Sequence, residues 1–290
     1  MHFLIVVNPA AGKSDHQHKE NAVSSFLESK EITFETYYTR KENSIPHLHD
    51  FLTEGREITD IAIIGGDGTI NLCLNALPHF NYTLSVVNNG TGNDSVKNLY
   101  AKKSLDEQVR AILEGKIKTI DLGSCNDRLF MNGVGIGFDG LVVRKMAALK
   151  KKKRGLWAYL SIVLQLLPRK TSFNTTIRHD GEAINQSIFS MTITKGTTFG
   201  GGFLMNPNAL PVDGLLDVCR FNKVNLLQKM IILPWVFIGK HGWFKPISYS
   251  KSKEIEISSD MLIPGHIDGE LIESRHFVLK VLPKQLKIRV

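Results

Sequence analysis

A short stretch near residue 65 carries the residue types best suited to chemistry. Residues 61–69 read Ile-Ala-Ile-Ile-Gly-Gly-Asp-Gly-Thr, an apolar run followed at once by three glycines, an acid and a hydroxyl. The run predicts a buried strand, and Ile70, Leu72 and Leu74 behind it predict a helix packed back on the sheet. A glycine turn between a strand and a helix presents backbone N–H groups and the positive helix end, and both suit a phosphate. Asp67 would repel a bare phosphate but suits one that carries magnesium.

Two further turns follow expected strands and carry similar residues. Asn89-Gly90-Thr91-Gly92-Asn93-Asp94 comes after the strand expected at Leu84–Val87. With Asp67 it places an aspartate in each of two glycine-rich turns, which predicts a site for phosphate and magnesium. The turn at Asn8–Ser14 ends in Gly-Lys-Ser, but position 7 is valine where a P-loop needs glycine, so a P-loop is excluded.

Two Asp-Gly pairs lie farther along the chain, at Asp213-Gly214 and within Ile267-Asp268-Gly269-Glu270. On local grounds alone, both are typical of hairpin turns between strands. The sequence also has two His-x-His pairs, at 16–18 and 47–49. Positions i and i+2 do not share a face of a helix, so we expect no metal site at these histidines.

Regular elements must position these turns, and the first 120 or so residues alternate between strands and helices. The expected strands are Phe3–Val7, Ile32–Tyr38, Ile61–Ile64 and Leu84–Val87, and the expected helices are Ala22–Leu27, Ile45–Leu52, Ile70–Leu77 and Leu105–Leu113. Such alternation predicts an α/β fold with a parallel sheet covered on both faces. Ligands bind such sheets beyond the carboxyl ends of the strands, so we expect all three turns at that edge.

From about residue 121 the pattern changes to short strands separated by turns. These strands are expected at Phe173–Ile177, Ser187–Thr194, Gly214–Phe221, Glu254–Ser258, Leu271–Ile272 and Phe277–Val281. They predict an antiparallel β-sandwich domain, interrupted by helical segments near Leu141–Leu167 and Leu226–Gly239. We expect an α/β domain over residues 1–122 and a β-sandwich domain over 123–290, whose last residues could pack back on the first domain.

The composition is that of a folded cytoplasmic protein. Hydrophobic residues make up 42% and charged residues 22% of the 290 positions, and the three cysteines form no Cys-x-x-Cys pair. The first residues lack the basic region of a signal peptide. No apolar stretch reaches the ~20 residues that a membrane helix needs.

The net charge of +8 attracts anions, and its distribution indicates a membrane surface. Basic residues crowd the segment 144–154, and Trp157 and Tyr159 follow. A basic cluster beside aromatic residues suits an anionic membrane, which predicts transient binding at its inner face. A solvated helix face or loop is the alternative. We find no pattern typical of a nucleic-acid-binding module, so nucleic acid is not an expected partner.

Taken in order along the chain, these motifs resemble those of the soluble bacterial lipid kinases of the diacylglycerol kinase catalytic-domain family, nearly from end to end. The motifs are Asn8-Pro9 with Gly12, Gly65–Thr69, Gly90–Asp94, Gly135–Asp139, Gly200-Gly201-Gly202, Pro207 to Val218, and Asp268-Gly269-Glu270. The resemblance implies a nucleotide-binding domain like that of phosphofructokinases and NAD kinases, joined to a β-sandwich, with the active site in the cleft. It also implies an ATP- and magnesium-dependent kinase of phospholipid biosynthesis, with diacylglycerol, converted to phosphatidic acid, as the leading acceptor.

The same resemblance implies which residues bind ATP and magnesium. The nucleotide-binding residues would be Asn8, Pro9, Gly12, Thr39, Gly65, Gly66, Asp67, Gly68, Thr69, Asn71, Thr91, Asn93 and Asp94. Asp67 and Asp94 would organise the magnesium region. Family members with a structural magnesium hold it with an Asp-Gly aspartate and two backbone carbonyls, which here are Asp213, Leu210 and Leu215.

Asp268 and Glu270 match the catalytic acidic pair of the family. One of them would take the proton from the lipid hydroxyl as it attacks the γ-phosphate. We favour Glu270 as the base, assisted by Asp268, and the reverse order stays open. The chain departs from the family at Asn88-Asn89, where a proline and an apolar residue are usual, and at Ser95-Val96, where an aromatic is common. The acceptor is therefore less defined than ATP binding.

Two other functions remain open. NAD kinases share the Gly-Gly-Asp-Gly-Thr turn, but the Gly90–Asp94 turn and the Asp268-Gly269-Glu270 triplet argue against that function. The second is a nucleotide-binding, membrane-associated regulator without turnover, and the intact acidic residues argue against it. The oligomeric state also stays open, and an edge strand of the β domain could support a homodimer.

Overall fold

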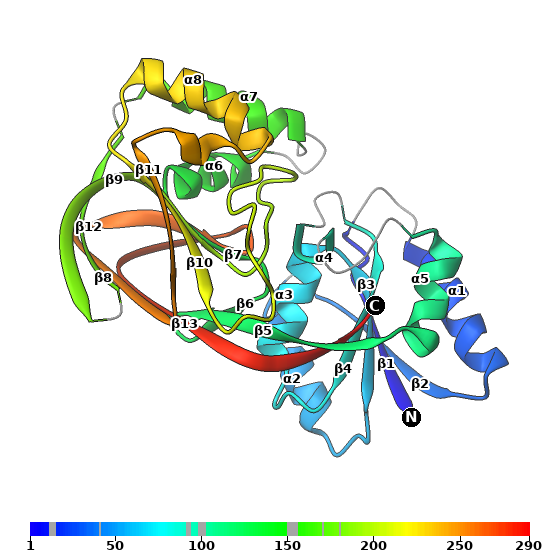
Figure 1. Ribbon diagram of the computed structural model, residues 1–290. Helices are drawn as coiled ribbons and strands as arrows, with labels where there is room; N and C mark the ends of the chain where they lie inside the picture. Colours follow the sequence, from blue (N-terminus) through cyan, green and yellow to red (C-terminus); the bar gives the residue numbers. More distant parts are fainter. Residues whose placement is uncertain are drawn as a thin grey trace. The chain divides into compact units, whose positions relative to one another are not determined.

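The computed structural model divides the chain into two compact units (Figure 1). Unit 1 comprises residues 1–120 and 284–290, and unit 2 comprises residues 121–283. The structure describes residues 1–11, 16–40, 42–90, 94–97, 103–149, 156–169, 171–179 and 181–290. Of the expected nucleotide-binding residues, Gly12, Thr91 and Asn93 therefore lie outside the described residues, as do positions 150–154 of the basic segment.

Unit 1 is built on four strands that pair in parallel in the order β4-β3-β1-β2. They are β1 (His2–Val7), β2 (Thr33–Tyr38), β3 (Asp60–Gly65) and β4 (Thr83–Asn88). Every residue of β3 and all but the first residue of β1 are buried. A sheet covered on both faces has no solvent side, which explains the continuous apolar runs.

Helices cover both faces of this sheet. They are α1 (His16–Ser29), α2 (Ser44–Thr53), α3 (Asp67–Ala76), the short α4 (Asp94–Lys97) and α5 (Leu105–Glu114). Helices α1 and α5 contact each other, as do α2 and α3, and Figure 1 shows the two pairs on opposite faces of the sheet. On the α1–α5 face, Phe3, Ile5 and Val7 of β1 pack with Leu27 and Ile112. This spacing of two follows from the alternation of side chains along a strand.

The last residues of the chain belong to unit 1. Strand β13 (Glu270–Arg289) ends there, in parallel pairing with β4. The side chain of Arg289 is buried and forms an ion pair with Asp60, with 2.9 Å between Nη2 and Oδ1. The backbone of Val290 exchanges two hydrogen bonds with that of Lys116, at 2.9 and 3.0 Å. The terminal segment is thus part of the core of unit 1.

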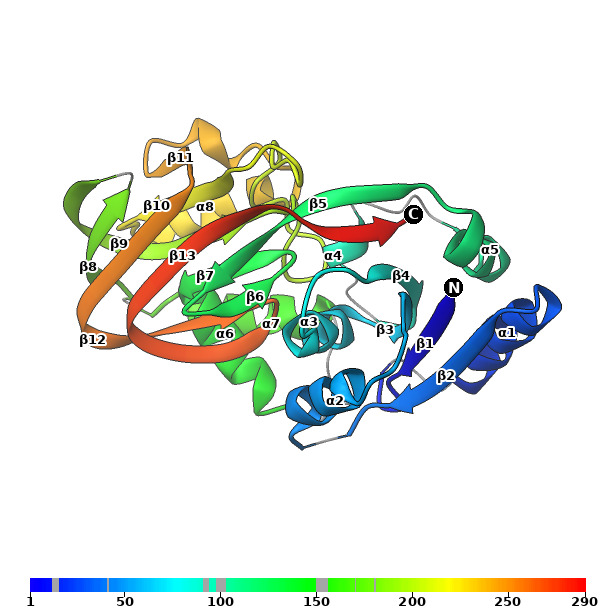
Figure 2. The ribbon, with the colours of Figure 1, turned by 90° about the horizontal axis from the view of Figure 1, so that it is seen from below.

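Unit 2 is an antiparallel β structure (Figure 2). Besides β13, its strands are β5 (Ile117–Cys125), β6 (Arg128–Phe130), β7 (Gly133–Gly137), β8 (Phe173–His179), β9 (Glu182–Thr194), β10 (Leu216–Asn222), β11 (Ile247–Ser252) and β12 (Glu254–Ile267). Strands β9 and β12 each pair with β7 near one end and with β8 near the other. The four strands therefore close on themselves around a core, in which alternate side chains such as Val134 and Ile136 point inward.

Three helices and a short 3-10 helix cover one face of unit 2 (Figure 1). They are α6 (Phe138–Ala147), α7 (Leu156–Leu166), α8 (Leu226–Phe237) and η2 (His241–Trp243). A second apolar cluster lies between these helices and the sheet and includes Phe138, Ile162, Phe189, Phe221 and Ile232. Among the described residues, no helix is both long enough and apolar enough to cross a membrane.

The prediction of an α/β domain followed by a β domain is confirmed, but several elements differ. The strands expected at Leu271–Ile272 and Phe277–Val281 are parts of the single strand β13, because pairing with β12 resumes beyond a register shift. The helical segment expected at Leu141–Leu167 consists of two helices, α6 and α7. Sequence analysis missed α4, β5, β6, β7 and β11. The elements α4, β6 and β7 have five residues or fewer, which gives too little periodicity to recognise, and the nine-residue β5 begins with three exposed residues.

Candidate functional site

The glycine turn after β3 is held by side chains on both sides. A Cβ atom on Gly65 would lie 2.4 Å from Oγ1 of Thr69, so the close approach of α3 requires glycine here. The same Oγ1 accepts a hydrogen bond from Nδ2 of Asn8 at 2.9 Å, and Oδ1 of Asn8 accepts the N–H of Ala10 at 3.0 Å. The bond between Asn8 and Thr69 joins the turn after β1 to the turn after β3. The space around Gly68 is open, since a Cβ atom there would meet no other atom within 4 Å.

Asp67 links this turn to the turn after β4. Its carboxylate accepts the backbone N–H groups of Asp94 at 3.2 Å and of Ser95 at 2.9 Å. Both belong to the start of α4, where a helix leaves its N–H groups without internal partners. Asp67 thus caps the start of α4 and lies beside Asp94. A magnesium role for the two aspartates stays a prediction.

Lys19 on α1 is a cation at the same edge that sequence analysis missed. Its Nζ donates to the carbonyl of Asn88 at 2.8 Å and to Oδ1 of Asn89 at 2.9 Å. Nδ2 of Asn89 donates to the carbonyl of Ala11 at 3.1 Å. The two asparagines that depart from the family pattern therefore tie α1 and the first turn to β4. A single lysine on a helix gives no sequence signal for such a role.

The other predicted nucleotide-binding residues lie at strand ends, except for Asn71, which is buried within a helix. Asn8, Pro9, Thr39 and Gly65–Thr69 follow strand ends at the carboxyl edge of the sheet, where the N–H of Thr39 donates to the carbonyl of Val7 at 2.9 Å. Asn71 is buried in α3, and its own carbonyl and side chain accept from Asn75 Nδ2. We conclude that Asn71 has a structural task besides any contact with nucleotide.

In unit 2, Asp268 stabilises a tight turn between β12 and β13. Its Oδ1 accepts the N–H groups of Asn132 at 3.1 Å and Gly133 at 2.8 Å, and its Oδ2 accepts that of Met131 at 3.0 Å. The backbone of Asp268 has a φ of +46°, a left-handed conformation that aspartate tolerates better than most residues. Three donors therefore engage this carboxylate, which makes Asp268 a positioning group.

Glu270 is more accessible, with its side chain half exposed at the start of β13. Its carboxylate forms an ion pair with the guanidinium of Arg128 on β6. Sequence analysis missed Arg128, which lies far from Glu270 along the chain. Of the predicted acidic pair, Glu270 is thus the more exposed carboxylate, and its role as the base stays a prediction.

The predicted structural magnesium site contains a lysine. Nζ of Lys195 lies 2.8 Å from Oδ1 of Asp213 and 2.6 Å from the carbonyl of Leu215, two of the three expected ligands. The third, Leu210, donates its backbone N–H to the carboxylate of Asp217. An ammonium group at hydrogen-bonding distance from these oxygens leaves no room for a metal ion bound to them. These residues do not fit a magnesium site, and sequence analysis gave no hint of Lys195.

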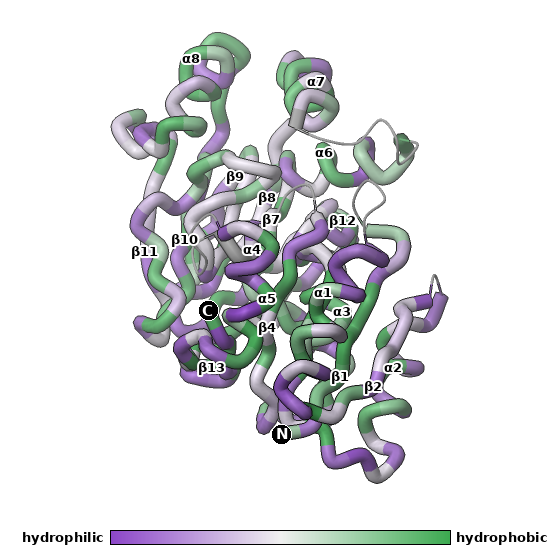
Figure 3. Tube along the Cα trace, turned by 90° about the vertical axis from the view of Figure 1, so that its right-hand side faces the viewer, coloured by the Kyte–Doolittle hydropathy of each residue, from purple (hydrophilic) through white to green (hydrophobic). Residues whose placement is uncertain are grey.

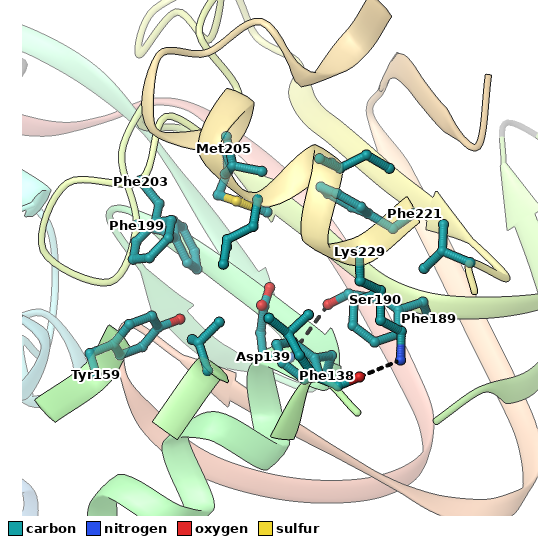
Figure 4. Close-up of a pocket in the computed structure, with 16 residues that line it drawn as sticks. Phe138, Asp139, Tyr159, Phe189, Ser190, Phe199, Phe203, Met205, Phe221 and Lys229 are labelled. Atoms are coloured by element: carbon teal, nitrogen blue, oxygen red, sulfur yellow. Dashed lines mark hydrogen bonds between the residues drawn. The ribbon is translucent and has the colours of Figure 1, made fainter. Parts of the chain in front are cut away.

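An apolar pocket lies in unit 2 beneath α7 and α8 (Figure 4). Its cavity volume is about 70 Å³, which is smaller than the ~300–1,000 Å³ typical of ligand pockets. Its lining residues are Phe138, Asp139, Tyr159, Val163, Leu167, Phe189, Ser190, Phe199, Phe203, Met205, Phe221, Val224, Lys229, Ile232, Leu233 and Val236. Nζ of Lys229 donates to the carbonyls of Leu167 and Arg169 at the end of α7, so it ties α8 to α7.

Among the described residues that line this pocket, Asp139 is the one carboxylate. Figure 4 shows it surrounded by apolar side chains. Its Oδ2 accepts a hydrogen bond from Oγ1 of Thr192 at 3.0 Å, and its backbone N–H donates to Oγ of Ser190 at 3.4 Å. Desolvation raises the pKa of Asp139 to about 6. A perturbed carboxylate in a pocket is a functional-site candidate, and its position in the Gly135–Asp139 motif was the available signal.

Unit 1 carries glycine-rich turns at the carboxyl edge of its sheet, and unit 2 carries the acidic Asp268-Gly269-Glu270 turn. Residues 2–125 match the family model of the diacylglycerol kinase catalytic domain, and residues 132–290 match that of the YegS C-terminal NAD kinase beta sandwich-like domain. The chain belongs to this family of lipid kinases, whose members transfer phosphate to a hydroxyl. The predicted family and enzyme class are confirmed.

Relatives extend over nearly the whole chain. The diacylglycerol kinase of Staphylococcus carnosus (strain TM300) is 26% identical, over 92% of this chain and 87% of the relative. The diacylglycerol kinase of Bacillus subtilis (strain 168) is 24% identical, over 97% of this chain and 96% of the relative. A crystal structure of a diacylglycerol kinase from Bacillus anthracis str. Sterne has a TM-score of 0.74 at 20% identity, covering 99% and 96% of the two chains. This last likeness concerns the fold.

Proposed function

We propose that this lipid kinase transfers the γ-phosphate of ATP, bound with Mg²⁺, to the hydroxyl of a membrane lipid, with diacylglycerol as the leading acceptor and phosphatidic acid as the product. The observation that carries the lipid assignment is the apolar pocket of unit 2. A soluble dinucleotide such as NAD would find few polar partners among its lining side chains.

In this proposal the first unit holds the phosphate donor. The backbone N–H groups of the Gly65–Thr69 turn would bind phosphate oxygens at the start of α3, where the helix end is positive. Gly68 has open space above it, which would let a phosphate approach the backbone. Asp94, beside Asp67, would contact the magnesium that accompanies the nucleotide.

Glu270 would act as the general base. As the lipid oxygen bonds to the γ-phosphorus, its proton would pass to the carboxylate of Glu270, and ADP would leave with its charge neutralised by magnesium. Arg128 would fix the orientation of this carboxylate through their ion pair. Asp268 would assist by holding the turn that begins β13.

The apolar pocket would accept an acyl chain of the lipid once α7 and α8 move apart, since its cavity of about 70 Å³ is smaller than such a chain. Phenylalanines from four segments of unit 2 line it, and burial of a hydrocarbon chain among them is favourable by about 0.8 kcal/mol per CH₂. An Ile232→Trp variant would fill part of this space. We expect a higher KM for long-chain acceptors with little change in the KM for ATP. An unchanged preference for chain length would contradict acyl binding in this pocket.

The outer surfaces of α7 and α8 would meet the membrane. Although the inner sides of both helices line the pocket, Trp157 and Leu164 of α7 and Leu227, Met230 and Ile231 of α8 are exposed. Figure 3 shows α8 hydrophobic around much of its length. Exposed apolar side chains on helices that carry a lipid pocket suit an interface with a bilayer.

Liposome binding tests whether the outer surfaces of α7 and α8 meet the membrane. The triple variant Leu227→Gln, Met230→Gln, Ile231→Gln should weaken binding to vesicles with anionic lipid, whereas Ile184→Gln on β9, also exposed, should not. Equal binding by both variants would assign docking to another surface, such as the basic segment 144–154. Two of its described members have partners, since Arg144 pairs with Glu273 and Lys145 donates to Gln165.

A transfer assay tests the activity itself. Labelled ATP and Mg²⁺ would be supplied with mixed micelles of diacylglycerol, sphingoid base, polyprenol and monoacylglycerol, alongside NAD. We expect labelled phosphatidic acid, reduced by about 10²–10⁴-fold in Glu270→Gln. Label in NAD would favour an NAD kinase, and bound ATP without any product would favour a regulator. A homodimer stays a prediction.

A further inference from the structure

Lys195 lies at the end of β9, in a cradle of oxygen atoms that belongs entirely to unit 2. Its side chain is fully buried. Three acceptors surround its Nζ, namely Oδ2 of Asp121 at 3.1 Å, Oδ1 of Asp213 at 2.8 Å and the carbonyl of Leu215 at 2.6 Å. An ammonium group has three N–H donors, so each donor has its own acceptor.

The groups in this cradle tie three distant segments together. Oδ2 of Asp121, at the start of unit 2, also accepts the N–H of Gly214 at 2.7 Å, and its backbone N–H donates to the carbonyl of Pro211 at 2.8 Å. The backbone N–H of Lys195 donates to the carbonyl of Asn132 at 2.8 Å. The loop 210–215 is therefore held against β5 and the end of β9 around one buried positive charge.

Two carboxylates close to each other and away from water repel unless a cation lies between them. In a metal-binding version of such a cradle that cation would be divalent, coordinated at about 2.1 Å by six oxygens, several of them from water. Here the Lys195 ammonium already makes direct contact with both carboxylates and the carbonyl. A divalent ion at the same oxygens would be repelled by the ammonium and would find its space filled.

We propose that the ammonium of Lys195 replaces a structural metal ion, so that unit 2 of this protein folds without any divalent cation. Magnesium would then be needed only with the nucleotide. The proposal does not depend on which lipid is phosphorylated. It corrects the sequence-based expectation that Asp213, Leu210 and Leu215 bind magnesium, because the lysine that occupies the site lies outside the Asp-Gly motif.

Lys251 offers a matched control. Its Nζ contacts the other oxygen of the same carboxylate, Oδ2 of Asp213, at 2.6 Å, and Oδ1 of Asp217 at 3.3 Å. Its side chain is 38% exposed, whereas that of Lys195 is 0% exposed. Removal of Lys251 leaves the cradle filled, and water can replace part of its interaction with Asp213.

The first measurement is equilibrium dialysis of the nucleotide-free protein against Mn²⁺, with Asp213→Asn in parallel. We expect the two proteins to bind the same amount of Mn²⁺, and the melting temperature of the unchanged protein to differ by less than about 1 °C between EDTA and Mg²⁺. Mn²⁺ that binds stoichiometrically and is lost in Asp213→Asn would overturn the proposal, because the cradle would then hold a metal.

The second measurement uses Lys195→Ala, with Lys251→Ala as the control. In EDTA, Lys195→Ala should lower the melting temperature by about 5–10 °C, because it removes the ammonium beside the buried carboxylate of Asp121, and Lys251→Ala should lower it much less. The vacated space should also create a Mn²⁺ site that the added Asp213→Asn change removes. A Lys195→Ala protein that neither loses stability nor gains this site would overturn the proposal. If Lys195→Ala does not fold, the dialysis of the unchanged protein decides.

Discussion

The carboxylate of Asp139 lies in surroundings that disfavour its charge. Apolar side chains of the pocket desolvate it, and the hydrogen bond from Thr192 compensates for only part of that cost, since the pKa is raised to about 6. Burial likewise lowers the pKa of His266 to about 4, so this neighbour of the same motif is neutral at pH 7. A neutral amide at this site would cost less desolvation free energy than the carboxylate of Asp139, which favours a functional reason for the aspartate.

Asp139→Asn is expected to stabilise the protein at neutral pH. Because the folded-state pKa is raised above the reference value of 3.8, ionisation costs stability that is intact below about pH 4 and lost as the pH rises through about 6. Relative to the unchanged protein, the variant should therefore gain up to about 3 kcal/mol at pH 7 and less than about 1 kcal/mol at pH 4. Urea unfolding at the two pH values measures the difference, and a gain that does not depend on pH would contradict this account.

Substitution of Asp268 should mainly reduce stability, and substitution of Glu270 should mainly reduce kinase activity. Asp268→Asn exchanges one acceptor oxygen for an N–H donor that faces backbone N–H groups, so we expect a loss of about 2–4 kcal/mol in the free energy of unfolding. Glu270→Gln disturbs only a half-exposed ion pair and should cost less than about 1 kcal/mol. Kinase activity should nevertheless fall more in Glu270→Gln when both are assayed well below their unfolding transitions. A greater loss of turnover in Asp268→Asn would assign the base to Asp268.

Sequence analysis located the turn between β3 and α3, whose motif is contiguous, and it missed contacts between residues that the fold brings together. Asp67 and the glycines around it could be found because strand, turn and helix follow one another within a few positions. Lys195 and its partner Asp121 are brought together by the β structure from distant segments. A buried lysine has the same appearance in a sequence as an exposed one, so no local pattern marks it.

At the scale of elements, the turn between β3 and α3 contains two glycines with opposite constraints. Gly65 is in contact with the side chain of Thr69, whereas Gly68 faces open space at the beginning of the helix. One glycine is therefore required by packing and the other is not. A glycine at position 68, at the start of the helix, would let a phosphate come close to the backbone.

Gly65→Ala should therefore reduce stability, whereas Gly68→Ala should reduce ATP binding. The first should destabilise unit 1 by roughly 1–3 kcal/mol, because the new methyl group displaces Thr69 and with it the hydrogen bond from Asn8. The second should leave stability unchanged or raise it by up to about 1 kcal/mol through helix propensity, while the KM for ATP rises. Thermal unfolding and nucleotide titration of both variants check this. Unchanged ATP binding by Gly68→Ala would exclude phosphate contact at that residue.

Element prediction depended on how each strand is buried. Strand β3 was found almost to the residue, since burial on both faces makes its sequence a continuous apolar run. Strand β13 was found only as two fragments, because the polar residues 273–276 lie between them. Its part beyond Val281 was missed, because Pro283 and the left-handed Lys284, with a φ of +50°, interrupt its alternation. Helix α4 has four residues, fewer than periodicity can detect, and depends on Asp67 for its first N–H groups.

At the scale of the whole molecule, the chain crosses from unit 2 back into unit 1 through a single strand. β13 begins with Glu270, the proposed base, and ends with Arg289, whose ion pair with Asp60 is buried in unit 1. Removing one partner of a buried pair leaves the other charge uncompensated, which is costly. The C-terminal end is therefore a structural part of the N-terminal domain.

Arg289→Met is expected to destabilise unit 1 by about 3–5 kcal/mol, because the carboxylate of Asp60 would stay buried without its cation. Arg178→Met removes an exposed ion pair with Glu256 and should cost less than about 1 kcal/mol. Chemical unfolding of the two variants provides the comparison. Similar losses in both would show that the terminal ion pair does not anchor the strand.

The return of residues 284–290 to unit 1 has a consequence for synthesis on the ribosome. The first 120 residues emerge early, yet the strand beside β4 and the partner of Asp60 are made only after residues 121–283. At about 5–20 residues per second, the intervening residues 121–283 take roughly 8–30 seconds to translate. Throughout that delay the nascent domain has an open strand edge, which is the kind of surface that aggregates. Prematurely terminated chains should therefore depend on chaperones far more than the finished protein does.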